Sequence, residues 1–279
     1  MNCCDLHTHS TFSDGTLTPT QLISEAERIG LDAIALCDHN TIAGLPEFIS
    51  AAEGRGVEAV AGVEFSTEYL DTELHILGLF IRPEHYSSVN EKLMEYTRRK
   101  DASNRELIEK LRCKGYHLDY DSIKAASPNG NINRAHIAAE LTKLGYTSSI
   151  KEAFKTLLSP SCGYYTPPQR LDAFETIRFI KSIGAVAVIA HPFLNLSVTS
   201  LRVFLEKAKP CGLDGMETLY SLYSDETTLL AKQIAREFSL LESGGSDFHG
   251  DNKPDISLGV GKGNLIISTE YLKKLRQAL

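Results

Sequence analysis

Short apolar runs alternate with amphipathic stretches over about the first ninety residues of the chain. This alternation is typical of repeated βα units around a parallel sheet or barrel. Thr18, Pro19 and Gln21 supply an N-cap, a first-turn proline and a capping-box partner for a helix that Gly30 ends. We expect strands at 3–6, 33–37, 57–63 and 74–79, and helices at 18–30 and 45–54.

The alternation is interrupted between about Val89 and Leu158, where the sequence is highly charged, has helical character and contains no convincing strand. It resumes after Pro167-Pro168. Helices are expected at 173–182, 203–209, 227–238 and 269–278, and strands at 185–190, 215–219 and 240–242. We therefore predict an α/β domain in two parts, 1–88 and 166–279, with a helical insert at 89–165.

Composition limits the classes of function. Hydrophobic residues at 42% and charged residues at 23% are ordinary for a globular enzyme and exclude disorder. A formal charge of −7 argues against a broad, sequence-independent grip on a nucleic-acid backbone, which needs a basic face. It does not exclude a small phosphate-bearing substrate, because bound metal ions would supply positive charge locally.

Cellular location and redox state follow from what the sequence lacks. The first ten residues carry Asp5 and a polar histidine motif, unlike a signal peptide, and no apolar run reaches the ~18 residues that span a bilayer. The six cysteines form no CxxC pair and are expected to be reduced. We expect a cytoplasmic protein with no membrane contact and infer no stable protein partner; the oligomeric state stays open.

Histidines and carboxylates gather where the expected strands end. His7 and His9 are spaced so that both imidazoles can reach one metal ion. His39 follows the second strand, and Glu64 ends the third, where a buried carboxylate needs a partner such as a metal ion. His75 is polar within an apolar strand, and alone it would be read as a core histidine.

The second half of the chain repeats this arrangement. His191 follows an apolar strand, and Asp247 and His249 repeat the two-residue spacing near the end. Asp14, alone, would be an ordinary turn residue, and His7 and His9 alone could equally be surface histidines. Six of the nine histidines stand at the ends or edges of expected strands, so we interpret the set as a metal site.

These motifs together resemble the PHP (polymerase and histidinol phosphatase) family over nearly the whole chain. The segments that carry the resemblance are Asp5-Leu6-His7-Thr8-His9-Ser10, Ser13-Asp14-Gly15, Asp38-His39, Gly62-Val63-Glu64, His75, Ala190-His191-Pro192 and Ser246-Asp247-Phe248-His249. The resemblance implies a distorted, TIM-like (β/α)7 barrel with its site at the carboxyl-terminal rim. It also implies a phosphoric ester hydrolase that uses divalent metal ions, with three per chain expected.

The resemblance assigns the ligands to three ions. The first ion takes His7, His9 and Asp247, and Glu64 bridges to a second ion held by His75 and His191. Asp14, His39 and His249 hold the third ion. Nitrogen and oxygen ligands without thiolates suit Mn, Fe or Zn. The implied reaction is in-line attack of activated water on phosphorus with no covalent protein intermediate. Its catalytic residues are Asp14, His39, Glu64, His191, Asp247 and His249.

Within this family the chain is most similar to stand-alone bacterial enzymes that act on nucleoside 3',5'-bisphosphates and on the 5' ends of short RNAs. The similarity rests on Arg134-Ala135-His136-Ile137-Ala138 and Gly163-Tyr164-Tyr165-Thr166-Pro167. That branch usually has an arginine where this chain has Pro168. Arg134 and His136 are expected to grip the uncleaved phosphate, although Arg134 could merely begin a surface helix. Tyr164 and Tyr165 could stack on a base or pack against the core.

Other interpretations remain open. Asp5 and Asp38 are expected to orient ligand imidazoles through the second ring nitrogen of each imidazole, and Asp38 could instead contact a metal ion. The substrate could instead be histidinol phosphate or another small phosphomonoester, since such an enzyme would share the metal site. A non-catalytic PHP module is a further alternative, but this chain keeps every expected ligand type. The expected partner is therefore a small nucleotide or a short oligoribonucleotide.

Overall fold

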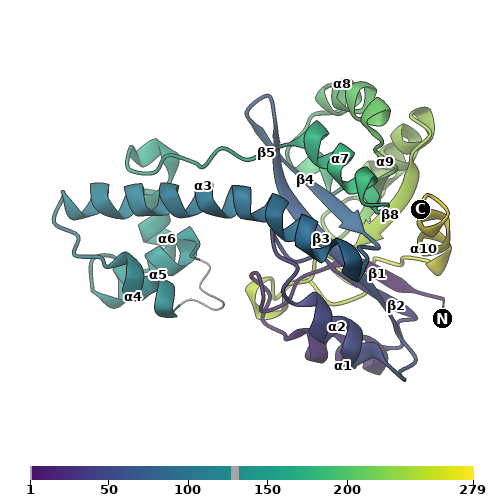
Figure 1. The fold of residues 1–279 in the computed structure, drawn as a ribbon, viewed down its shortest axis with the longest axis horizontal. Helices are drawn as coiled ribbons and strands as arrows, with labels where there is room; N and C mark the ends of the chain where they lie inside the picture. The colour runs from purple at the N-terminus through teal and green to yellow at the C-terminus, as the bar shows by residue number, and fades with distance from the viewer. Residues whose placement is uncertain (1, 127–131) are drawn as a thin grey trace. The chain divides into compact units, whose positions relative to one another are not determined.

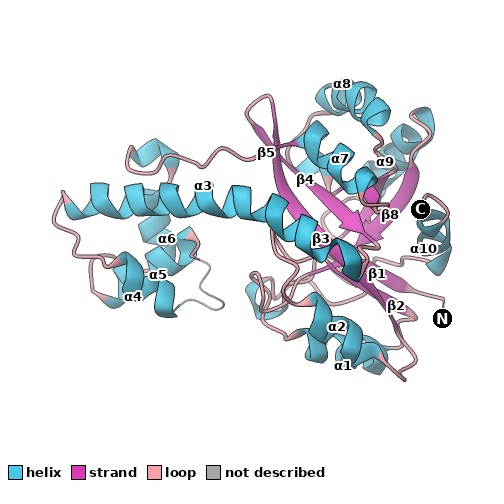
Figure 2. Ribbon diagram, viewed as in Figure 1, coloured by secondary structure: helices cyan, strands magenta, loops and turns pink. Residues whose placement is uncertain are grey.

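A computed structural model describes residues 2–126 and 132–279 (Figures 1 and 2). The strands are β1 (Cys4–Thr8), β2 (Ala33–Leu36), β3 (Glu58–Tyr69), β4 (Thr72–Leu79), β5 (Leu171–Asp172), β6 (Val186–Ile189), β7 (Gly215–Tyr220) and β8 (Leu241–Gly245). The α-helices are α1 (Pro19–Ile29), α2 (Leu45–Ala52), α3 (Tyr86–Arg112), α4 (Tyr120–Ala126), α5 (Arg134–Lys143), α6 (Ile150–Ala153), α7 (Ala173–Ser182), α8 (Val198–Ala208), α9 (Asp225–Glu237) and α10 (Thr269–Arg276).

The described strands form a nearly closed barrel in the order β1-β2-β3-β4-β6-β7-β8, and the two-residue β5 pairs with β3. The barrel closes where the end of β1 meets the segment after β8. There Asp247 N–H donates to the His7 carbonyl at 2.9 Å, and His9 N–H donates to the Phe248 carbonyl at 3.0 Å. The α/β barrel predicted from the sequence is confirmed.

One strand departs from the expected succession of parallel βα units. β4 runs antiparallel to both β3 and β6, and β3 and β4 form a hairpin. Leu70 and Asp71 connect them with φ values of 48° and 60°, the left-handed conformation that two-residue hairpin loops require. Because of this reversal, the beginning of β4 lies at the end of the barrel where its parallel neighbours finish.

Local capping explains where the helices begin. As predicted, the Thr18 hydroxyl accepts from Gln21 N–H at 3.2 Å, the Gln21 side chain accepts from Thr18 N–H at 2.8 Å, and Gly30 ends α1 with φ 78°. The prediction that α8 begins at 203 was wrong. It begins at Val198, because the Ser197 hydroxyl accepts from Ser200 N–H at 3.1 Å and caps the helix one turn earlier.

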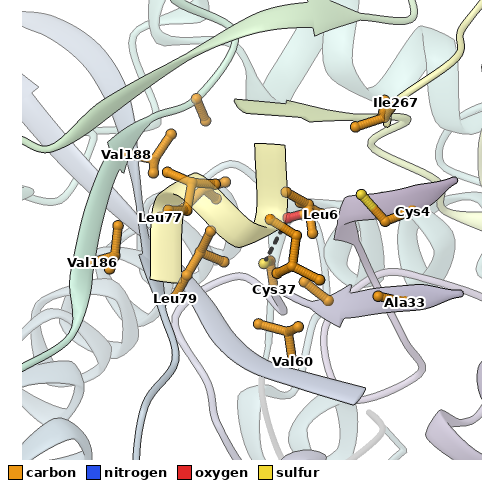
Figure 3. Close-up of a cluster of buried hydrophobic side chains, with 14 of the residues drawn as sticks. Cys4, Leu6, Ala33, Cys37, Val60, Leu77, Leu79, Val186, Val188 and Ile267 are labelled. Carbon is orange, nitrogen blue, oxygen red and sulfur yellow. Dashed lines mark hydrogen bonds between the residues drawn. The ribbon is translucent and has the colours of Figure 1, made fainter. Parts of the chain in front are cut away.

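The core of the barrel is a cluster of small and branched side chains shared by five strands and α10 (Figure 3). Cys4 and Cys37 belong to it, and the Cys37 thiol donates to the Leu6 carbonyl at 3.6 Å. Both cysteines are buried and free, in keeping with a packing role. Outside the barrel, α1 packs against α2, α2 against β3, and α7 against β3, β4 and β6 (Figure 1).

The described chain divides into two compact units. The barrel unit contains the chain up to Leu93 together with Leu171–Leu279, and the helical unit contains Met94–Arg170. The helical unit has its own core, built on Leu107, Leu111 and Ile137 among others. The boundaries at 88/89 and 165/166 stay a prediction from the sequence. Among the described residues, no helix is long and apolar enough to cross a bilayer.

Candidate metal centre

Nine side chains predicted as metal ligands meet at one end of the barrel. They are His7, His9, Asp14, His39, Glu64, His75, His191, Asp247 and His249. Each lies within 4.0 Å of at least one other member of the set through a nitrogen or oxygen atom. Segments from the two ends of the chain contribute to the same cluster.

The strand directions explain this convergence. Parallel strands end at a common rim, so residues after β2, β6 and β8 arrive there together. His75 arrives from the first half of β4, opposite Ser66, because β4 is antiparallel. The prediction that Glu64 ends its strand was wrong: β3 continues to Tyr69, since its second half forms the hairpin with β4. Glu64 therefore points into the cluster from the middle of a strand.

Four ligand atoms surround one point. His7 Nε2 lies 3.1 Å from His9 Nε2, and both nitrogens lie 3.3 Å from Glu64 Oε2. Asp247 Oδ1 is 3.2 Å from His9 Nε2 and 3.9 Å from His7 Nε2. Ligands held about 2.1 Å from a tetrahedral ion lie roughly 3.4 Å apart. The spacing of these four atoms suits a single divalent ion.

The two carboxylate oxygens of Glu64 face different neighbours. Oε1 lies 2.7 Å from His75 Nδ1 and 3.1 Å from His191 Nε2. Oε2 faces His7 and His9, and also lies 2.8 Å from His39 Nδ1. A carboxylate placed in this way can bridge two ions.

A third group of ligand atoms surrounds Asp14 Oδ1. His249 Nε2 lies 3.2 Å from this oxygen, His39 Nε2 lies 3.8 Å from it, and His9 Nδ1 lies 4.0 Å from it. The Asp14 side chain is 43% exposed, whereas the Glu64 side chain is fully buried. The centre is therefore closed on the Glu64 side and open to solvent on the Asp14 side.

Three buried polar atoms in the cluster make no hydrogen bond of suitable geometry among the described residues, although each lies within 4.0 Å of another ligand atom. They are His9 Nδ1, Glu64 Oε2 and His75 Nδ1. A buried polar group without a partner costs about 1–3 kcal/mol. Coordination to cations would offset that cost, so the donor set fits divalent metal ions.

The carboxylates of the centre remain ionised. Burial raises the pKa of Glu64, but the surrounding imidazoles, His75 foremost, outweigh burial and hold the pKa well below its usual value. Burial also raises the pKa of Asp247, while the hydrogen bond from His9 and the charge of His7 hold it well below its usual value. Anionic oxygen ligands are what a divalent cation requires.

Several supporting residues were missed in the sequence analysis. Glu217 on β7 is fully buried and its Oε1 accepts from His7 Nδ1–H at 2.9 Å. Tyr220 and Lys253 donate to Asp247 Oδ2 at 2.8 and 2.7 Å. In the sequence, Glu217 is a carboxylate inside an apolar strand, as Glu64 is. The same pattern could therefore have identified Glu217.

The predicted roles of Asp5 and Asp38 were wrong. Asp5 accepts from Ser246 N–H at 2.9 Å, from the Ser246 hydroxyl and from Gly259 N–H, so it binds segments together rather than orienting an imidazole. Asp38 accepts from Ser10 N–H at 2.7 Å and from the Ser13 hydroxyl at 2.6 Å. It thereby holds the loop that precedes Asp14.

Two ligand residues have strained backbone. His191 has φ 26° and Asp247 has φ 56°, values uncommon for residues other than glycine. Such conformations cost about 1–3 kcal/mol and persist where surrounding contacts fix them. Glu217 accepts from His191 N–H at 2.7 Å, and Tyr220 holds the Asp247 carboxylate.

The four predicted substrate contacts lie in the helical unit. The Arg134 guanidinium lies over the Tyr165 ring at 4.2 Å and its Nη1 donates to the Leu158 carbonyl at 3.2 Å. His136 takes part in the cap of α5, since its Nδ1 accepts from Asn133 N–H at 3.2 Å. Tyr164 and Tyr165 are half-buried and pack against the core of this unit.

A rim of imidazoles and carboxylates on an α/β barrel defines a metal-dependent hydrolase. The chain belongs to the PHP domain family, whose sequence profile matches residues 5–159. It is 35% identical over 246 residues to the 5'-3' exoribonuclease of Haemophilus influenzae, covering 88% of this chain and 89% of the relative. It is 30% identical over 263 residues to the 3',5'-nucleoside bisphosphate phosphatase of Chromobacterium violaceum, covering 91% and 90% of the two chains.

A solved structure agrees with these relationships. A protein from Bifidobacterium adolescentis, named as a proposed metal-dependent phosphoesterase, superposes with a TM-score of 0.82 and 28% identity over 99% of this chain and 96% of its own. Its family and its fold together identify this protein as a phosphoric ester hydrolase that depends on metal ions. The expectations of fold, family and enzyme class from the sequence are confirmed.

Proposed function

We propose that this protein hydrolyses phosphate esters of nucleotide substrates. It either removes the 3'-phosphate from nucleoside 3',5'-bisphosphates or cleaves the phosphodiester bond of the terminal nucleotide in short 5'-phosphorylated RNAs. The convergence of nine nitrogen and oxygen ligands carries the proposal, since three of them have buried atoms that make no hydrogen bond of suitable geometry among the described residues. The names of the two relatives support the class of substrate.

Three divalent ions, Mn, Fe or Zn, would be held by this chain. The first would lie among His7, His9 and Asp247, with Glu64 bridging to the second. His75 and His191 would complete the second, since both face Glu64 Oε1. The third would lie among Asp14, His39 and His249.

When bound, such ions lower the pKa of water toward neutrality and neutralise charge on the phosphoryl oxygens. The chain's own residues prepare the site for that chemistry. Glu64 and Asp247 are ionised and buried, which fixes negative charge opposite the cations without further reorganisation. Asp14 stands on the solvent-exposed side, where a phosphate group can enter. No protein nucleophile is required, because the donor set suffices for hydrolysis by water.

Arg134, His136, Tyr164 and Tyr165 are proposed as substrate contacts. Arg134 offers a guanidinium that matches phosphate oxygens, and Tyr165 fixes its plane. Arg134→Lys keeps the charge but loses the bidentate geometry. We expect this variant to raise KM for nucleotide substrates with metal content unchanged, and an unchanged KM would contradict the assignment.

The decisive experiment is a substrate panel with metal content measured on the same sample. The panel contains nucleoside 3',5'-bisphosphates, 5'-phosphorylated di- to pentanucleotides, histidinol phosphate and a simple monoester. We expect the highest kcat/KM for one of the first two classes. A preference for histidinol phosphate would overturn the nucleotide assignment, and no hydrolysis after loading with Mn, Fe or Zn would favour a non-catalytic module.

A matched pair of variants controls for folding. Glu64→Gln removes the bridging charge, and Glu58→Gln makes the same change at the first residue of β3, where Glu58 pairs with Arg276 on the surface. Activity is expected to fall by several orders of magnitude only in Glu64→Gln. Equal activities would contradict a catalytic role for this centre.

A further inference from the structure

Glu217 lies outside every ligand group described above, yet it contacts two of them. Its side chain is fully buried on β7. Oε1 accepts from His7 Nδ1–H at 2.9 Å, and Oε2 accepts from the main-chain N–H of His191 at 2.7 Å. Each carboxylate oxygen therefore holds a different residue of the centre.

The contact with His7 selects the nitrogen that faces the centre. A neutral imidazole has one N–H and one lone pair, so donation from Nδ1 leaves the lone pair on Nε2. Nε2 is the atom that lies 3.1 Å from His9 Nε2 and 3.3 Å from Glu64 Oε2. Glu217 thus sets both the tautomer and the ring orientation of His7.

The contact with His191 acts on the backbone. His191 has φ 26° and ψ 52°, a conformation that needs support from its surroundings. With its N–H bonded to Glu217, its Nε2 lies 3.1 Å from Glu64 Oε1. Loss of this bond would let the residue relax and move its imidazole.

We propose that Glu217 is a positioning residue that couples the two ligand groups sharing Glu64. One carboxylate orients His7 on the Oε2 side of Glu64 and His191 on the Oε1 side. The group around Asp14 has no contact of this kind with Glu217 among the described residues. This inference rests on the proposed metal centre, and it predicts that two of three ions depend on Glu217.

Glu217→Gln tests the coupling while nearly preserving side-chain shape. The glutamine oxygen can accept one of the two hydrogen bonds, but its amide nitrogen cannot accept the other. In titrations with Zn²⁺ against a chromophoric chelator, two ions should bind about 10- to 100-fold more weakly, and the third should be unchanged. Glu58→Gln should match the wild type. Unchanged binding in Glu217→Gln, or equal weakening of all three ions, would overturn the proposal.

A measurement on the wild-type protein guards against a variant that fails to fold. In the Zn²⁺-loaded protein with ¹⁵N-labelled histidine, His7 should carry its proton on Nδ1, and Nε2 should show the shift of a coordinated nitrogen. A proton on Nε2 would overturn the proposal. Wild-type protein that binds neither Zn²⁺ nor Mn²⁺ would instead refute the metal centre itself, which separates the two failures.

Discussion

Tyr220 donates its hydroxyl hydrogen to Asp247 Oδ2 at 2.8 Å, while Asp247 Oδ1 lies 3.2 Å from His9 Nε2. The two oxygens of one carboxylate thus have separate tasks. Oδ2 receives hydrogen bonds from Tyr220 and from Lys253, and Oδ1 faces the ligand cluster. The Asp247 carboxylate is thus supported by two side chains that are not among the nine predicted ligands.

Tyr220→Phe should destabilise the metal-free protein by about 1.5–3 kcal/mol, because a buried hydrogen bond to a charged group is lost. Urea denaturation measures this change. Tyr271→Phe is the control, since the Tyr271 hydroxyl accepts only from the half-exposed Lys232 at 3.2 Å among its described contacts. Equal stability losses in the two variants would contradict a specific role for the bond to Asp247.

Asp38→Asn should weaken binding of the ion near Asp14 by about tenfold or more, because Asp38 holds Ser10 and Ser13 in the loop before Asp14. Metal content after dialysis against dilute Zn²⁺ measures the change, and one ion per chain should be lost. Asp32→Asn is the control, since Asp32 lies before β2 and binds Cys3 N–H at 2.8 Å. Full metal content in Asp38→Asn would refute this role.

Gly245→Ala should destabilise the protein by about 3 kcal/mol or more, because the added Cβ would lie 2.1 Å from His7 Cβ and 2.7 Å from His7 N. The contact includes backbone, which cannot move without separating β1 from β8. Thermal unfolding measures the effect. Gly56→Ala, which meets no atom within 4 Å, should be nearly neutral. A stable Gly245→Ala protein would mean that the barrel seam is loosely packed.

Metal binding should release protons at neutral pH. Burial lowers the pKa of His75, but Glu64 and Glu73 outweigh burial and raise it from 6.5 to about 10. The stabilisation from protonated His75 is thus complete below pH 6.5 and is lost as pH rises through about 10. A bound ion requires the neutral imidazole, so affinity for Zn²⁺ should rise with pH up to about 10.

Calorimetry of Zn²⁺ binding in two buffers of different ionisation enthalpy measures this release. The heats should differ between the buffers at neutral pH, and Glu73→Gln should reduce the difference because it removes one of the charges that raise the pKa of His75. Identical heats in both buffers would contradict the prediction.

The barrel could be predicted because its strands and helices carry local signals, as Thr18, Gln21 and Gly30 do for α1. The β3–β4 hairpin could not. Its loop, Leu70-Asp71, lacks the Asn-Gly or Asp-Gly pair that predicts such turns, and strand direction depends on tertiary packing. Periodicity alone does not distinguish a parallel strand from an antiparallel one.

The gathering of the histidines was predictable because six of the nine stood at the ends or edges of expected strands, and the resemblance to the PHP family supplied the rest of the ligand set, Asp14 included. Their partners were not, since Tyr220 and Lys253 resemble ordinary core and surface residues in sequence. Asp5 and Asp38 were misjudged because a carboxylate beside a histidine in sequence can point to a different element. Asp5 bonds to Ser246, 241 positions away.

The seam between β1 and the segment after β8 has a consequence for biosynthesis. His7 and His9 are synthesised before Asp247 and His249, which follow about 240 positions later in the chain. Until the later segment is made, His7 and His9 lack Asp247 and His249, the residues that complete their ligand groups. The complete ligand set can therefore hold metal ions only after the segment that follows β8 has been synthesised and has closed the barrel.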